Sequence, residues 1–109
     1  MGGWIALLLA QDLGSRVAAL VGIAAAPDFT QWGFSDEQKA IIQQQGKLVE
    51  KTPYGDEPSV IMRGFWESGQ SLRLLDSEIA IDCPVRLLQG QSDADVPWQT
   101  ALRIMETLR

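Results

Sequence analysis

The sequence predicts an α/β fold in which helices flank a parallel sheet, and two pairs of segments carry this prediction. Residues 3–13 form an almost wholly apolar helical segment that stops at Gly14, and residues 17–24 form a continuous apolar run, which is typical of a buried parallel strand. A second apolar run, residues 85–89, leads through a polar loop into an amphipathic helical pattern over 96–108. Because the first helix has almost no polar face, we expect it to be buried by further elements.

The middle of the chain, residues 30–82, has a different composition: it is polar, rich in glutamine and interrupted by glycine and proline. Ser35 and Gln38 form a capping-box pattern, which predicts a helix that ends near Glu50. Pro58 suits the first turn of another helix, because apolar residues then recur at helical spacing. These residues are Ile61, Met62, Phe65, Trp66, Gly69 and Leu72. In the final helix we expect Leu102, Ile104, Met105 and Leu108 to face inward.

The bulk composition excludes several classes of protein. At 109 residues the chain is at most one domain. Its net charge of -5 and lack of a basic block argue against a nucleic-acid partner, and no apolar run approaches the roughly 20 residues of a membrane span. The single cysteine, Cys83, excludes an internal disulfide and predicts a cytoplasmic protein; we expect its side chain to be buried. There is no histidine.

Two carboxylates lie in the loop after the apolar run 85–89. The carboxyl edge of an open α/β sheet is where catalytic groups gather. The pattern Gly-x-x-Asp-x-x-Val-Pro, from Gly90 to Pro97, resembles the loop that carries the acid of the catalytic triad in α/β-hydrolases. The resemblance implies that Asp93 is this acid, while Asp95 is expected to cap the next helix or to be solvated at its start. The alternative is that Asp93 itself only caps a helix or a turn.

The first residues carry a second resemblance to the same family. In α/β-hydrolases the nucleophile lies on a Gly-x-Ser-x-Gly elbow before a buried helix, and Met1-Gly2-Gly3-Trp4 is similar to the residues directly after that serine. The resemblance implies that the backbone N–H of Met1 forms half of an oxyanion hole and that Gly2 closes the elbow. The chain order of the triad is Ser, Asp, His, which places the serine just before Met1 and the histidine beyond Arg109.

By this resemblance the chain is a single partial α/β-hydrolase domain, an internal fragment that lacks the N-terminal strands and the C-terminal strand and helix. Residues 1–29 are the post-elbow helix and a core strand, 30–82 a helical cap, and 83–109 a core strand, the acid loop and a helix. The cap implies substrate-binding roles for Trp32, Phe65 and Trp66, with core packing as the alternative. The run 83–90, Cys-Pro-Val-Arg-Leu-Leu-Gln-Gly, is most similar to the mitochondrial palmitoyl-protein thioesterase and acyl-glucuronide esterase type.

The function implied is that of a serine hydrolase that cleaves ester or thioester bonds of a small-molecule acyl substrate without a cofactor. The isolated chain is expected to be inactive, because two triad members are absent, and to associate through its open strand edges. The alternative function is a non-catalytic interaction module that docks on a partner through helix 3–13 and the open sheet edge. The absence of histidine favours this alternative.

Two rival sites are weaker. Gly90-Gln-Ser-Asp-Ala94 mimics a nucleophile elbow around Ser92, but Pro97 would fall inside the helix that must come next, and no histidine is present to accept the proton of the serine. A metal site formed by Asp93 and Asp95 would have too few oxygen ligands, since Ca²⁺ takes six to eight. We therefore expect no metal.

Overall fold

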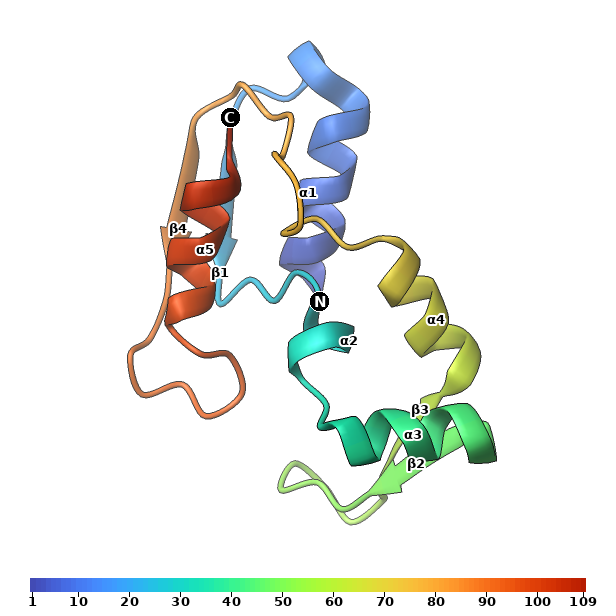
Figure 1. The fold of residues 1–109 in the computed structure, drawn as a ribbon. Coiled ribbons are helices and arrows are strands. Elements are labelled where there is room, and N and C mark those ends of the chain that lie inside the picture. Colours follow the sequence, from blue (N-terminus) through green and yellow to red (C-terminus); the bar gives the residue numbers. More distant parts are fainter. The chain divides into compact units, whose positions relative to one another are not determined.

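The computed structural model describes residues 1–109 and divides them into two compact units. Unit 1 comprises Met1–Asp28 and Arg73–Arg109, and unit 2 comprises Phe29–Leu72 (Figure 1). The chain therefore leaves unit 1 after Asp28 and returns to it at Arg73. None of the helices combines the length and apolar character that crossing a membrane requires.

Unit 1 is built around a pair of parallel strands. Strand β1, Leu20–Ile23, pairs with β4, Val85–Leu88, with Leu20 opposite Val85. Helix α1, Gly2–Leu13, precedes β1 and ends at Gly14, whose φ of 55° is a conformation that glycine adopts readily. A short 3₁₀ turn, Gly14–Arg16, then leads toward the strand. The sequence prediction of a parallel sheet with a preceding apolar helix is confirmed.

The apolar elements of unit 1 are covered on one face only. In α1, Trp4, Leu7 and Ala10 are buried, whereas Ile5, Leu9 and Leu13, one helical turn apart from each other, are 39–51% exposed. In β1 the side chains alternate, so that Val21 and Ile23 are 63% and 75% exposed. The expectation of burial on all sides is therefore not met within this chain. Its residues alone do not cover the second face of the helix or of the sheet.

The last helix, α5, Gln99–Thr107, buries Thr100 and Ile104, which are one turn apart. Leu102 and Met105 are 48% and 61% exposed, so the prediction that they face inward was wrong. The helix begins three residues later than predicted. The side of the helix that faces the rest of unit 1 is the one that carries Thr100 and Ile104. The chain after α5 forms a parallel bridge between Leu108 and Ile79.

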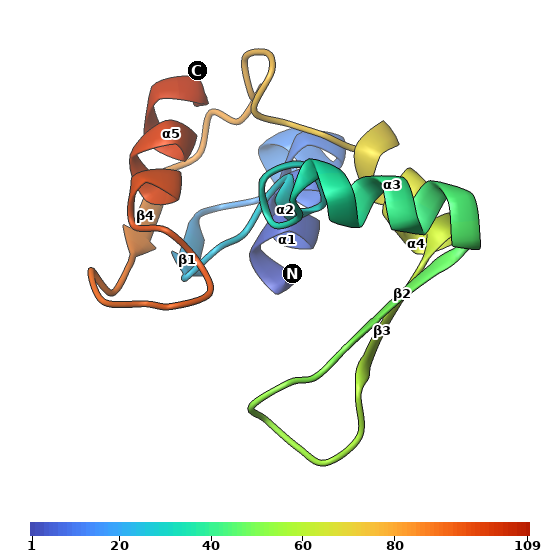
Figure 2. The ribbon, with the colours of Figure 1, turned by 60° about the horizontal axis from the view of Figure 1, so that its bottom comes forward.

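Unit 2 contains three helices and a β-hairpin. The helices are α2, Phe29–Trp32, α3, Asp36–Gln45, and α4, Arg63–Ser71. The hairpin pairs β2, Lys47–Glu50, with β3, Ser59–Met62, in antiparallel register, and Figure 2 shows it side-on with its long loop. The predicted capping box is confirmed, because Ser35 and Gln38 each accept the backbone N–H of the other.

The hairpin replaces parts of the two helices predicted for the middle segment. Helix α3 stops before Gly46, which has a left-handed φ of 82°, so the predicted extension to Glu50 was wrong. Likewise the residues after Pro58 begin a strand rather than a helix. The physical reason is that Val49 pairs with Val60 across the hairpin, and β-branched residues favour the pleated strand.

The core of unit 2 is formed by Ile42, Leu48 and Trp66. The indole Nε1 of Trp66 donates to the carbonyl oxygen of Thr30 at 2.9 Å, and the Thr30 hydroxyl is 2.9 Å from Oε1 of Gln70. Gly69 lies directly against Thr30, because a Cβ added at Gly69 would lie 2.9 Å from the hydroxyl oxygen. Helix α4 therefore packs against Thr30 through three of its residues, Trp66, Gly69 and Gln70.

Gly69→Ala is expected to lower the free energy of unfolding by about 1–3 kcal/mol, because its methyl group would overlap the Thr30 side chain. Gly64→Ala is the matched control in the same helix, since a Cβ there meets nothing within 4 Å, and it should stabilise the protein by up to about 1 kcal/mol. Urea unfolding of both variants measures the difference. Equal effects at the two positions would contradict the packing of Gly69 on Thr30.

Candidate active-site edge

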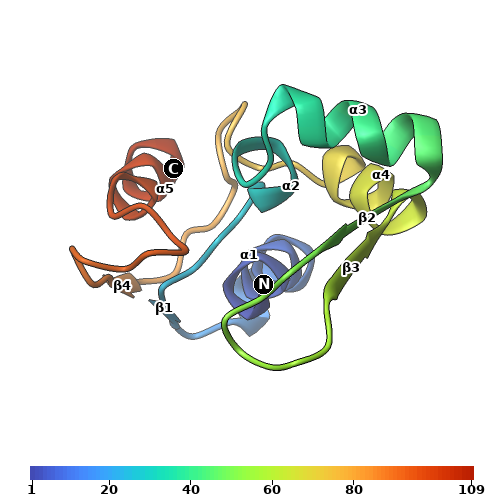
Figure 3. The same ribbon diagram turned by 90° about the horizontal axis from the view of Figure 1, so that it is seen from below.

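The two catalytic positions predicted from the sequence both lie toward the carboxyl end of the parallel strand pair. In Figures 1 and 3 the N-terminus before α1, the end of β1 and the loop between β4 and α5 lie at the same end of unit 1. This loop contains Asp93, and the N-terminus is Met1. Ligands and catalytic groups of open α/β sheets gather at this edge.

Asp93 is exposed at the surface, and its carboxylate is held by its own loop. Oδ1 accepts the backbone N–H of Asp95 at 2.8 Å and that of Val96 at 2.9 Å. The N–H groups of Val96 and Asp95, with a smaller contribution from the Gln89 side chain, hold the pKa of Asp93 below its ordinary value of 3.8. The group is therefore an oriented carboxylate that stays ionised throughout the pH range in which an imidazole titrates.

Met1 directly precedes α1 as its N-cap residue. Its carbonyl oxygen accepts the N–H groups of Trp4 at 3.0 Å and Ile5 at 3.2 Å. Of the two glycines after it, Gly3 is the one in close contact, since an added Cβ would lie 2.5 Å from the Cβ of Ala25, whereas Gly2 has open space around it. The close backbone contact of this turn is therefore made at Gly3, against the segment after β1.

Sequence reasoning missed Asp28, the other carboxylate that lies after a strand. Asp28 is 3% exposed, and its φ is 60°. Its Oδ1 accepts the N–H of Leu74 at 2.7 Å and its Oδ2 that of Leu75 at 2.9 Å. Because both oxygens are buried and bound to backbone groups, Asp28 is a structural residue, unlike the exposed Asp93. The only local signal was a proline and an aspartate directly after an apolar strand.

The three aromatic residues proposed for substrate binding all lie in unit 2. Trp66 is buried in the core of that unit. Phe65 is 43% exposed, and its ring centroid lies 6.0 Å from that of Phe29. Trp32 is half-buried at the end of α2. Among the three, Phe65 is the most exposed, and the binding role stays a prediction.

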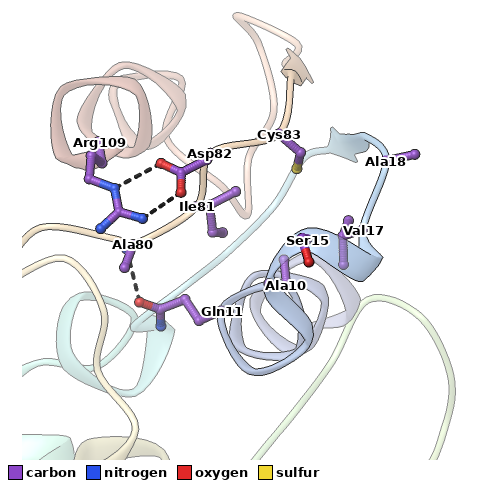
Figure 4. A pocket seen from close by; sticks show the side chains of 11 residues that line it. Ala10, Gln11, Ser15, Val17, Ala18, Ala80, Ile81, Asp82, Cys83 and Arg109 are labelled. Atoms are coloured by element: carbon purple, nitrogen blue, oxygen red, sulfur yellow. Dashed lines mark hydrogen bonds and ion pairs between the residues drawn. The ribbon is translucent and has the colours of Figure 1, made fainter.

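A hollow of about 500 Å³ lies on unit 1 around the C-terminal end of α1 (Figure 4). Arg109 forms a two-pronged ion pair with Asp82 at 2.8 and 2.7 Å, and Gln11 accepts the N–H of Ala80 at 3.1 Å. Cys83 also lines the hollow and is half-buried, which corrects the expectation of a buried thiol. Neither Met1 nor Asp93 contributes to this hollow.

Comparison with known proteins extends the description of the site. No family model matches the chain. The protein named palmitoyl-protein thioesterase ABHD10, mitochondrial, is 31% identical in human over 97% of this chain and 35% identical in mouse over 99%. A putative hydrolase from Agrobacterium vitis S4 superposes over the whole chain with a TM-score of 0.86 and is 39% identical. The α/β hydrolase domain-containing protein 10 from mouse superposes over 97% of the chain with a TM-score of 0.83 and is 32% identical. The chain has the fold of part of an α/β-hydrolase.

The α/β-hydrolase prediction made from the sequence, including its likeness to the palmitoyl-protein thioesterase type, is confirmed. The chain spans 36–38% of the length of these curated relatives and 44–46% of the two solved hydrolases. The predicted cytoplasmic location is wrong, because all five curated relatives are named as mitochondrial proteins.

Proposed function

We propose that Asp93 is the acid of a Ser–His–Asp triad that hydrolyses ester or thioester bonds of acyl substrates. The observation that carries the proposal is the exposed Asp93 carboxylate, held by two backbone N–H groups in a loop at the carboxyl edge of the strand pair. The similarity to palmitoyl-protein thioesterases supports a hydrolase and favours an S-acyl thioester and a mitochondrial location.

The mechanism assigns each step to one group. The serine attacks the acyl carbonyl, and a histidine takes its proton. Asp93 holds the imidazole in the productive tautomer and stabilises the imidazolium, while the N–H of Met1 donates to the oxyanion. The chain has no histidine, so the proposal requires an imidazole from residues outside these 109, and it assigns the serine to such residues as well. Of the proposed substrate-binding aromatics, Phe65 is the best placed to contact an acyl chain, because its ring is partly exposed.

The full-length protein and the isolated 109-residue chain provide the test of this function. We expect the full-length protein to hydrolyse matched S-acyl and O-acyl substrates, to prefer the thioester, and to lose activity on treatment with a fluorophosphonate that labels serine nucleophiles. The isolated chain should show no hydrolysis above the blank, because its triad is incomplete. A full-length protein that is inert toward both substrates, or an isolated chain as active as the full-length protein, would contradict the proposal.

One observation favours the alternative of a non-catalytic interaction module. Helix α1 and strand β1 each expose large apolar side chains, and proteins often cover such groups with a partner. Recovery of the full-length protein in a complex of defined stoichiometry, without acyl hydrolysis, would favour this function over the hydrolase.

A further inference from the structure

The side chain of Gln89 bridges the two ends of the acid loop, residues 90–97. It is the first residue after β4, and its side chain is half-buried. The amide Nε2 donates to the carbonyl oxygen of Gly90 at 3.2 Å and to that of Val96 at 3.2 Å. A side-chain amide has two N–H groups, and here they join the first residue of the loop to a residue near its end.

Val96 links this closure to the carboxylate. Its N–H donates to Oδ1 of Asp93, its carbonyl oxygen accepts from Gln89, and its side chain is 9% exposed. Pro97 comes next and fixes its own φ. Val96 is therefore held at its N–H, its carbonyl and its side chain. The position of the Asp93 carboxylate depends on Val96, and that of Val96 depends on Gln89.

We propose that Gln89 is a positioning residue for Asp93, an inference that rests on the proposed hydrolase function. Gln89 holds the loop in the form that presents the carboxylate to the imidazole. Its amide is neutral, so it closes the loop and adds a small stabilisation of the Asp93 carboxylate without neutralising the charge that Asp93 must offer. A misplacement of about 1 Å at a catalytic group lowers the rate by about 100-fold, which makes the closure of this loop a determinant of kcat.

Gln89→Met in the full-length protein tests the inference, because methionine has a similar size but no N–H group. We expect kcat to fall by roughly 10- to 100-fold, with KM changed less than about twofold because the substrate is bound elsewhere. The acid limb of the kcat/KM profile should move to lower pH, since a loosely held carboxylate stabilises the imidazolium less. Hydrogen exchange at the Val96 amide should be faster than in the wild type.

Gln91→Met is the matched control, an exposed glutamine in the same loop, and it should retain wild-type kcat and pH profile. Asp93→Asn, measured in parallel, separates the two levels of inference. If Asp93→Asn keeps full activity, the proposed triad acid is wrong. If Asp93→Asn is inactive while Gln89→Met keeps wild-type kcat and acid limb, the positioning role is overturned. An equal loss in Gln89→Met and Gln91→Met would also overturn it.

Discussion

Asp93→Asn in the full-length protein is expected to lower kcat/KM by about 10³- to 10⁴-fold, the loss seen when a triad acid becomes an amide. Asparagine keeps an oxygen that can accept the N–H groups of Asp95 and Val96, so the loop retains its fold. It lacks the negative charge, and its amide group can hold the imidazole in the unproductive tautomer. The loss should therefore fall on kcat more than on KM.

Asp95→Asn is the control for charge in the same loop. Its backbone N–H remains to bind Asp93, so we expect it to keep most of the wild-type activity. Urea unfolding of both variants should give a free energy within about 0.5 kcal/mol of the wild type, as for other exposed positions. If Asp93→Asn keeps full activity, or if Asp95→Asn loses more activity than Asp93→Asn, Asp93 is not the triad acid.

Asp28→Ala is expected to destabilise the full-length protein by at least about 3 kcal/mol. The change leaves the buried N–H groups of Leu74 and Leu75 without their carboxylate, and each unsatisfied buried donor costs about 1–3 kcal/mol. A further cost of about 1 kcal/mol arises because alanine must adopt the left-handed φ of 60°. The effect is large because one side chain joins two segments of unit 1 that are far apart in sequence.

Two further substitutions divide this cost into its parts. Asp28→Gly removes the same hydrogen bonds without the backbone strain and should be about 1 kcal/mol less destabilising than Asp28→Ala. Asp28→Asn keeps one acceptor oxygen and should lose roughly half as much as alanine. Asp56→Ala, in the exposed loop of unit 2, is the control, with a change within about 0.5 kcal/mol. A loss below about 1 kcal/mol in Asp28→Ala would show that the carboxylate is not a structural clamp.

The sequence predicted those features of the fold that depend on short segments. The capping box at Ser35 and the stop at Gly14 are set by residues within one turn, and the apolar runs predicted the parallel strands. The β2–β3 hairpin was missed because its pairing joins Val49 to Val60 across a loop, and a short apolar run does not distinguish a helix from a strand. The inward face of α5 was misjudged because it depends on where the rest of unit 1 lies.

The candidate site was predictable to the extent that a motif marks it. Asp93 was predicted as the triad acid because its spacing from Gly90 and Pro97 resembles that of a known acid loop, and this role stays a prediction. Nothing in the spacing marked Gln89, since its role depends on two hydrogen bonds to backbone oxygens. Asp28 was missed for the same reason, because its partners Leu74 and Leu75 lie in a distant segment.

The measurement that tests the central claim most directly is the proton NMR spectrum of the full-length protein at a pH where its histidines are protonated. If Asp93 holds the catalytic imidazole, its strong hydrogen bond should give a far-downfield Nδ1 proton resonance that is absent from Asp93→Asn and present in Asp95→Asn. A downfield resonance that persists unchanged in Asp93→Asn would show that another carboxylate binds the imidazole, and the assignment of Asp93 as the triad acid would be wrong.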